Sequence, residues 1–175
     1  SAASDVYKRQ FSERLGKHLN GLANTSGGLI VVGVEEGKIV GVGEQFATRE
    51  LETAVLEAAL SSTPPVPLYA VEWEEKTIEE ETIIEERVVI EEKIVIEEKI
   101  VNEEKIVKVL VIEVADTKDK YVQHLYKEKA YQRQENHTVE MAVEKAKGKK
   151  DRLRASILQI SLEDVVNAND SEEVQ

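Results

Sequence analysis

The apolar residues near the start of the chain recur at helical spacing. Phe11, Leu15, Leu19 and Leu22 lie three or four positions apart with polar residues between them, which is the pattern of an amphipathic helix with one buried face. Asparagine and glycine follow within residues 24–28. Because both tolerate the positive φ that ends a helix, we expect the helix to stop there.

Short apolar runs rich in β-branched residues predict strands further along the chain. Residues 29–34 have the composition of a strand buried on both faces. Residues 39–42 return as a second strand after an acidic glycine turn, so the two strands are expected to form a hairpin. Residues 106–114 are almost continuously apolar and predict a central strand.

A second helix is predicted over residues 49–60, where the apolar side chains share one broad face and Thr48 offers an N-cap. Three prolines follow it and stop the helix. Residues 68–74 then alternate as a strand. The residues predicted to share one face of that strand are Tyr69, Val71 and Trp73.

The C-terminal third gives shorter signals. Residues 130–134 predict another strand, and a short helix is expected to begin at Thr138. Residues 161–164 have the form of a capping box that opens one more helix. Beyond it the chain becomes a polar tail.

Residues 82–105 repeat with a period of six, in which a mostly apolar triplet precedes two glutamates and one basic residue. A helix turns about 100° per residue and would spread the triplets around its surface, whereas a strand keeps each position on one face. A single strand would be about 75 Å long. We therefore expect short strands that turn at the glutamates, or a long hairpin arm; disorder is a third alternative. The repeat is either a tandem expansion without a role of its own or an acidic arm that touches a partner.

Together these elements predict an α+β domain with a mixed sheet, flanking helices and a repeat-expanded β insertion at about residues 76–105. The domain is assigned to residues 11–145. Residues 1–10 lack a clear periodicity and are expected to be a disordered or artefactual N-terminal arm. Residues 146–175 are assigned to a basic linker and C-terminal tail. The absence of an initial methionine suggests a fragment of a longer protein.

The chain of 175 residues has the length of one ordinary domain. It contains no cysteine and three histidines, which excludes disulfides, thiolate metal sites and cysteine nucleophiles and argues against histidine-rich metal sites. No apolar run is long enough to span a bilayer, and no signal peptide opens the chain. We expect a cytoplasmic protein without a membrane partner.

The net charge of −12 argues at first against nucleic acid, because phosphate binding needs lysine and arginine. The negative charge is concentrated, however: residues 72–105 carry fourteen acidic and five basic residues, against 21 and 18 in the remainder. A basic run follows later and is either a set of phosphate contacts or a solvated linker. Its members are Lys145, Lys147, Lys149, Lys150, Arg152 and Arg154.

The glycines and acidic residues near residue 35 contain no standard catalytic motif. Neither a P-loop nor a GxGxxG string in the required context occurs. Glu35 and Glu36 sit at a predicted turn and would need a third carboxylate to hold a divalent cation, so a solvated turn is favoured. The three histidines belong to no catalytic constellation and are expected to be structural or surface residues.

The string LANTSGGLIVVGVEEGKIVGV at residues 22–42 resembles the core motif of the Schlafen AlbA domain family. Residues 109–114, 120–125 and 130–133 also resemble family segments, with Arg133 at an arginine position of the family. The resemblance covers about residues 11–145. The residues that it marks as structural parts of the motif are Asn24, Thr25, Gly27, Gly28, Gly33, Gly37 and Gly41.

This resemblance implies a Schlafen AlbA-like α+β fold and a nucleic-acid-binding module of a prokaryotic transcriptional regulator, with DNA favoured over RNA. Arg133 joins the basic run as a predicted contact, no cofactor or metal is expected, and further domains are expected beside it. The fragment itself is not expected to be an enzyme. One alternative is a metal-dependent ribonuclease using Glu36 with Mg²⁺ or Mn²⁺, although the family's other glutamate motif is missing. Another is a protein-interaction or homodimerisation domain that uses the acidic repeat.

Overall fold

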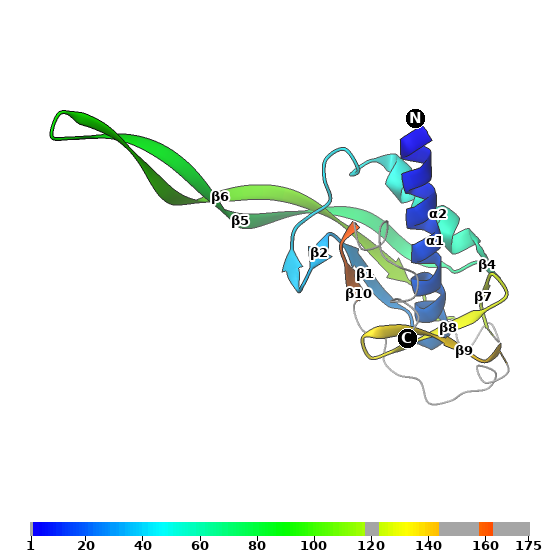
Figure 1. Ribbon diagram of the computed structural model, residues 1–175. Helices are drawn as coiled ribbons and strands as arrows, with labels where there is room; N and C mark the ends of the chain where they lie inside the picture. The colour runs from blue at the N-terminus through cyan, green and yellow to red at the C-terminus, as the bar shows by residue number, and fades with distance from the viewer. Residues whose placement is uncertain (1, 118–122, 144–157, 163–175) are drawn as a thin grey trace.

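The computed structural model describes residues 2–117, 123–143 and 158–162 of the chain. Two helices pack on one face of a four-stranded sheet, and a long two-stranded arm projects from this globular part (Figure 1). The helices are α1 (Ala2–Thr25) and α2 (Arg49–Leu60). The predicted α+β class, with a mixed sheet and flanking helices, is confirmed.

The main sheet has the strand order β10–β1–β6–β5. Its inner strands are β1 (Gly28–Val32) and β6 (Lys93–Val114), which pair antiparallel. β5 (Leu68–Ile90) pairs antiparallel with β6 at one edge, and β10 (Leu158–Ile160) runs parallel to β1 at the other. The central position predicted for residues 106–114 is therefore confirmed.

Three small antiparallel pairs complete the described strands. They are β2 (Val34–Glu35) with β3 (Lys38–Ile39), β4 (Ser62–Thr63) with β7 (Leu125–Tyr126), and β8 (Ala130–Gln134) with β9 (His137–Met141). The β8–β9 hairpin packs against the C-terminal half of α1 (Figure 1). This arrangement places α1 between the main sheet and a second, smaller layer.

The core forms where the predicted helix face meets the sheet. Phe11, Leu15, Leu19 and Leu22 are fully buried and belong to one cluster with residues of β1, β6 and α2. α2 has the predicted bounds, although Thr48 makes no side-chain cap hydrogen bond. Its buried residues are Leu51, Ala54, Val55, Ala58 and Ala59.

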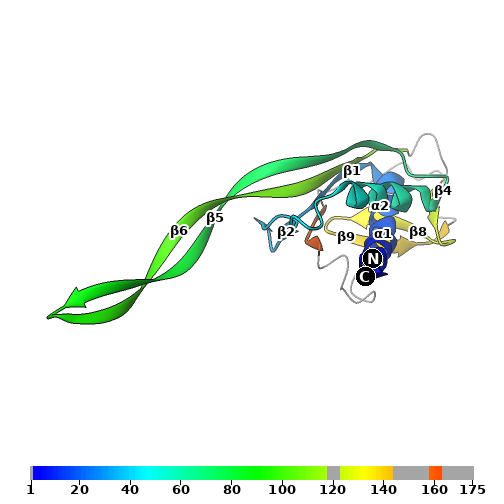
Figure 2. The same cartoon turned by 90° about the horizontal axis from the view of Figure 1, so that it is seen from above.

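The hexad repeat lies in the arm. β5 and β6 stay paired out to Ile90 opposite Lys93, far beyond the end of the main sheet (Figure 2). Glu91 and Glu92 turn the chain with φ values of 50° and 60°, as a two-residue type I′ hairpin requires. Of the three alternatives for the repeat, the long hairpin arm is the observed one. That the arm arose as a repeat-expanded insertion stays a prediction.

The first helix begins earlier than the apolar pattern predicts. α1 starts at Ala2, so residues 2–10, assigned to a disordered or artefactual arm, are helical. Tyr7 gives the physical reason, because its ring stacks on Phe46 with centroids 4.5 Å apart and packs against the core. Its partner lies in a loop, where no sequence pattern could indicate the contact.

The predicted hairpin of residues 29–34 and 39–42 is wrong in its pairing. The first strand ends where Gly33 adopts a φ of 115°. Beyond that glycine the chain forms the short β2–β3 hairpin, and Val42 bridges to Lys108 of β6. Only alternate residues of β1 are fully buried, so the prediction of two buried faces is also wrong.

The alternation predicted for residues 68–74 is interrupted by a bulge. The β5–β6 register shifts between Leu68 and Ala70, and Tyr69 is the extra residue. Its side chain is 71% exposed, whereas Val71 and Trp73 pack against the core. The three residues therefore do not share a face.

β9 replaces the short helix predicted from Thr138. Gln134 pairs with His137 across a two-residue turn in which Glu135 has a φ of 51°. The chain thus reverses immediately, and Thr138 pairs with Arg133.

The C-terminal division also differs from the prediction. Residues 158–160 lie in the segment assigned to linker and tail, yet they form β10 beside β1. Most of the helix predicted to open at residues 161–164 lies outside the described residues.

Candidate nucleic-acid interface

Asn24 ties the end of α1 to the segment that carries β7 and β8. Its Nδ2 lies 3.0 Å from the carbonyl oxygen of His124 and 3.1 Å from that of Tyr131, and its Oδ1 accepts the His124 N–H at 2.7 Å. Asn20, one turn earlier, accepts the Tyr131 N–H at 3.0 Å. An amide can serve both sides because it carries donors and acceptors.

Thr25 and Arg133 form a second tie. Thr25 Oγ1 donates to the Gly21 carbonyl at 2.7 Å and accepts the Arg133 N–H at 2.8 Å. The Arg133 guanidinium donates to Thr138 Oγ1 at 2.9 Å, and the same hydroxyl forms a hydrogen bond with His18 Nδ1, also at 2.9 Å. Burial lowers the pKa of Arg133 because desolvation disfavours its charged form.

His124 is fully buried between two loops. Its Nδ1 lies 2.6 Å from the Pro64 carbonyl, which can only accept, so Nδ1 carries the proton. Its Nε2 lies 2.6 Å from Thr117 Oγ1, and the Thr117 hydroxyl donates to the Ala23 carbonyl at 3.1 Å. Burial lowers the pKa of His124, and the bond to Pro64 opposes this in part. This histidine therefore has a structural position.

The motif glycines allow close approach of the backbone. A Cβ at Gly27 would lie 2.6 Å from the Val114 carbonyl oxygen, and one at Gly41 would lie 2.5 Å from Val107 Cβ. Both residues also have positive φ, at 70° and 81°. The other motif glycines with positive φ are Gly28, Gly33 and Gly37. Gly27, Gly33 and Gly41 therefore lie in close contact with β6 or the residues that follow it, whereas Gly37 lies in the open β2–β3 turn.

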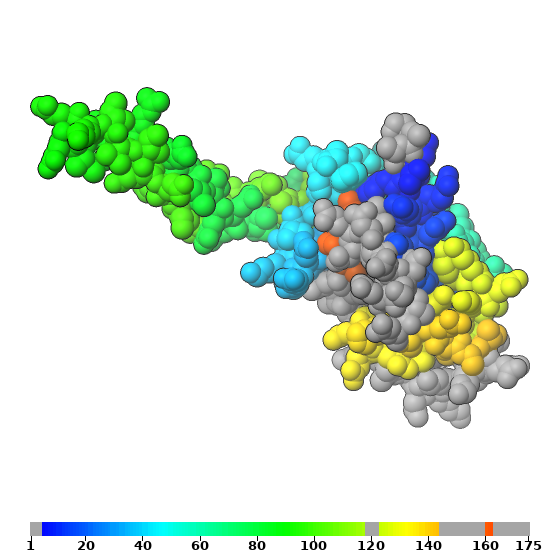
Figure 3. Space-filling view, viewed as in Figure 1, coloured from blue at the N-terminus to red at the C-terminus, as the bar shows by residue number. Residues whose placement is uncertain are grey.

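A hollow of about 480 Å³ lies between α1 and the β7–β8 segment, which are side by side on one face of the globular part (Figure 3). Four basic and two acidic residues line it. We term it the basic groove. Its charged residues are Arg14, Lys17, Lys127, Lys129, Glu13 and Glu140.

Two local structures bring these bases together. Arg14 and Lys17 lie three residues apart on α1 and so project from neighbouring positions on its surface. Lys127 occupies a tight turn after β7 with a φ of 48°. The Tyr126 hydroxyl donates to the Glu13 carbonyl at 2.8 Å and holds this turn against the helix. Separation along the chain explains why sequence patterns did not reveal the groove.

The contacts within the groove favour the phosphate groups of a nucleic acid over its nucleobases as the ligand. Lys127 Nζ lies 5.4 Å from the centre of the Tyr126 ring, and Lys129 forms an exposed ion pair with Glu140 at 3.8 Å, a type of pair that contributes little. The Tyr126 and Tyr131 rings are only 4% and 5% exposed. Nucleobases therefore find no open aromatic surface on which to stack.

The residues that the sequence predicted to contact nucleic acid do not line the basic groove in the described structure. Arg133 is 3% exposed and bound inside the β8–β9 hairpin, so its contact with nucleic acid stays a prediction that requires the side chain to leave this position. The whole basic run lies outside the described residues. Its members are Lys145, Lys147, Lys149, Lys150, Arg152 and Arg154.

Glu36 lies exposed in the β2–β3 turn with a φ of 50°. Within the described part of the chain, no three acidic or histidine side chains gather closely enough to hold a metal ion. The nuclease role of Glu36 stays a prediction.

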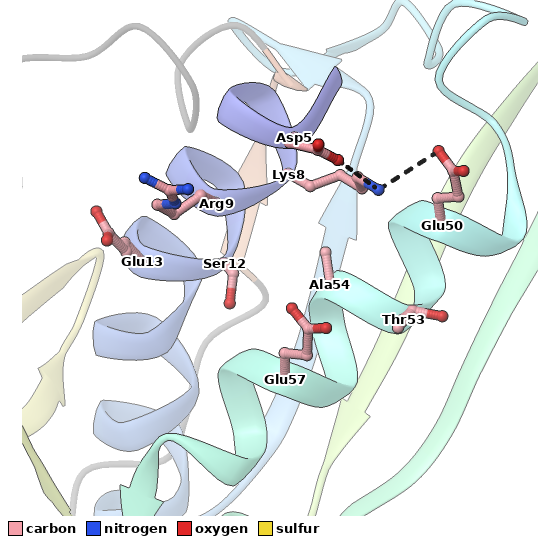
Figure 4. A pocket seen from close by; sticks show the side chains of 9 residues that line it. All are labelled: Asp5, Lys8, Arg9, Ser12, Glu13, Glu50, Thr53, Ala54 and Glu57. Carbon is pink, nitrogen blue, oxygen red and sulfur yellow. Dashed lines mark ion pairs between the residues drawn. The ribbon is translucent and has the colours of Figure 1, made fainter. Parts of the chain in front are cut away.

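A second hollow, of about 370 Å³, separates the N-terminal half of α1 from α2 (Figure 4). Lys8 spans it, with Nζ 3.5 Å from Asp5 and 3.8 Å from Glu50. Glu13 and Glu57 add further acidic groups. Because acids outnumber bases here, this hollow suits phosphate less well than the basic groove.

Neither of the two described helices is long and apolar enough to cross a membrane. The sequence model of one protein family, described as Schlafen, AlbA_2, matches residues 2–142. No curated protein and no solved structure matches the chain.

Proposed function

The chain belongs to the Schlafen AlbA_2 family, and from this premise we propose that it is a nucleic-acid-binding module whose basic groove contacts phosphates. The observation that carries the proposal is the convergence of four bases from α1 and the β7–β8 segment on one hollow. This local excess of positive charge occurs in a chain with a net charge of −12. Segregated charge of this kind attracts a polyanion to one face.

Duplex DNA is the proposed target. The buried tyrosine rings of the groove disfavour recognition of single strands, which relies on stacking. Contacts between lysine or arginine and phosphate position a duplex without reading its bases. We therefore expect weak sequence preference from this module. A place within a transcriptional regulator is part of the same proposal and rests on the family resemblance.

The basic run is proposed to extend the groove. It follows β9 directly in the sequence, beginning four residues after Met141. Met141 pairs with Ala130, the residue next to Lys129 of the groove. The chain therefore leaves β9 beside the groove before it enters the basic run.

The test is fluorescence anisotropy of labelled duplex DNA, single-stranded DNA and RNA across a salt series. In the groove variant, Lys17, Lys127 and Lys129 are changed to glutamine. We expect duplex DNA to bind with an affinity that falls steeply with salt, and each lost phosphate contact to reduce the slope of log K against log salt by about 1.

A matched control changes three arm lysines, Lys93, Lys99 and Lys105, to glutamine, so that the net charge changes equally far from the groove. Equal loss in the two variants would show that total charge alone governs binding and would refute the groove. A third variant changes five residues of the basic run to glutamine and measures how much of the binding affinity the run contributes. The five residues are Lys147, Lys149, Lys150, Arg152 and Arg154. No binding at low salt by the unchanged chain would refute the module. Preference for RNA would refute the proposed target.

A further inference from the structure

The two faces of the arm differ in exposed apolar surface. Residues opposite one another on β5 and β6 point to the same face, and Ile83 is paired with Ile100, Val89 with Ile94. These four side chains are between 65% and 72% exposed. With Ile96, which is 61% exposed, they define what we term the isoleucine face. No described segment of the globular part covers it (Figures 1 and 2).

The opposite face, termed the lysine face after Lys93, Lys99 and Lys105, is nearly compensated in charge, because these three lysines stand against four glutamates. Lys99 pairs with Glu86 and Lys105 with Glu80, each at 3.9 Å across the strands. The apolar side chains on this face, including Ile84 and Val88, are less exposed. This face is therefore suited to solvent.

Charge on the isoleucine face remains uncompensated within one copy. Glu85 is directly opposite Glu98, and like charges so placed repel. Arg87, two residues further along β5, is opposite Ile96 and forms no ion pair with any residue that the structure describes. It is the only basic residue on this face between Thr77 and Ile106.

We propose that the isoleucine face binds the same face of a second copy of this chain, with the two arms antiparallel. The two-fold axis lies in the plane between the two faces. It runs perpendicular to the strands, at the level midway between Glu85 and Arg87. Rotation about it places the Ile83–Ile100 pair against Val89 and Ile94 of the second copy. It also places Glu85 against Arg87 of the second copy, and the reverse, so each Arg87 meets an opposite charge. Ile96 lies against Glu98 of the second copy, beside this contact between Arg87 and Glu85.

The dimensions agree with such a dimer. The five apolar side chains expose on the order of 500 Å² per copy, so the contact buries on the order of 1,000 Å² in total, which is near the lower limit for specific interfaces. The turn of one arm reaches the level of Glu81 of the other, which keeps the globular parts apart. An isologous contact of this kind closes after two copies. This inference is independent of nucleic-acid binding.

The experiment is sedimentation velocity over a concentration series with charge-swapped variants. Glu85→Arg and Arg87→Glu each place like charges opposite one another, and each alone should dimerise at least about tenfold more weakly. The double variant, and an equimolar mixture of the two single variants, should restore dimerisation to within about threefold. The double variant and the mixture leave the average net charge unchanged, so restoration cannot come from total charge.

Adjacent isoleucines supply the control for the face. Ile83→Ser removes an apolar side chain from the isoleucine face and should abolish dimerisation, whereas Ile84→Ser alters the lysine face and should leave it intact. Far-ultraviolet circular dichroism checks that both variants keep the arm. The proposal is overturned if the unchanged chain is monomeric at every concentration, if the mixture fails to associate, or if Ile84→Ser has the larger effect.

Discussion

At Asn24, a single side chain supplies contacts that secondary structure does not. The end of α1 meets a loop at His124 and a strand at Tyr131, whose backbone groups have no ladder partner on that side. The amide satisfies groups of both residues at once, and Asn20 supports it through a 3.0 Å contact. The globular part therefore depends on this residue to join its two layers.

Replacing Asn24 by alanine should destabilise the domain by about 2–4 kcal/mol, because buried backbone donors and acceptors lose their partners. Urea denaturation followed by tryptophan fluorescence would measure the change. Asn102, which lies exposed on the arm, is the matched control, and its replacement by alanine should cost less than about 0.5 kcal/mol. Similar losses in the two variants would contradict the bridging role.

The motif residues illustrate what one sequence can and cannot predict at this scale. The resemblance marked Asn24, Thr25 and the glycines as structural positions, but their partners lie about 100 residues away in the chain. Only the fold brings those partners near. Arg133 was expected on a basic surface for the same reason: its residue type was visible, while its burial beside Thr138 was not.

At the scale of the elements, the arm carries repulsion between its own strands. Four glutamate pairs are directly opposite one another, among them Glu79 with Glu104. Such pairs destabilise a ribbon, and the ion pairs of the arm are too exposed to offset them strongly. The β-branched residues and the continuous ladder hold the arm against this repulsion.

Changing Glu104 to lysine converts one like-charge pair into an attractive pair and should stabilise the arm. Amide hydrogen exchange near this position should slow by up to about fivefold at low salt, and the gain should shrink as salt screens the charges. Glu113→Lys makes the same change opposite Ala70, where there is no like charge to relieve. Equal protection in the two variants would show that total charge, and not the cross-strand pair, controls the arm.

Periodic sequence patterns predicted these elements well. Features that depend on contacts between distant segments could not be predicted from such patterns. α2 has its predicted bounds, and a period of six, commensurate with a strand, indicated the arm. The helix expected at Thr138 fails because a two-residue turn reverses the chain. β10 was missed because it has three residues, and its position depends on pairing with β1, which no local pattern encodes.

Across the whole molecule, opposite charges are kept apart. The arm holds most of the negative charge and projects away from the globular part (Figures 1 and 2). The basic groove lies between α1 and the β7–β8 segment. A polyanion can thus approach the groove while the acidic arm stays at a distance.

The two proposed activities should therefore respond to salt in opposite directions. Binding of nucleic acid weakens as salt rises, whereas association of two acidic arms strengthens as their repulsion is screened.

Shortening the arm separates these activities in one variant. Replacing residues 82–101 by Asn-Gly keeps a two-residue turn like the one at Glu91 and Glu92, and it removes six acidic and three basic residues. The core cluster contains no residue of that segment, so the thermal midpoint of the globular part should shift by no more than a few degrees, about 3 °C.

Sedimentation of this shortened variant should show a monomer at all concentrations. Affinity for duplex DNA at low salt should be equal to or higher than that of the full chain, because the net charge becomes −9 instead of −12. A folded, monomeric variant that no longer binds DNA would place the nucleic-acid contact on the arm or make binding depend on the dimer, and a variant that does not fold would show that the arm supports the core.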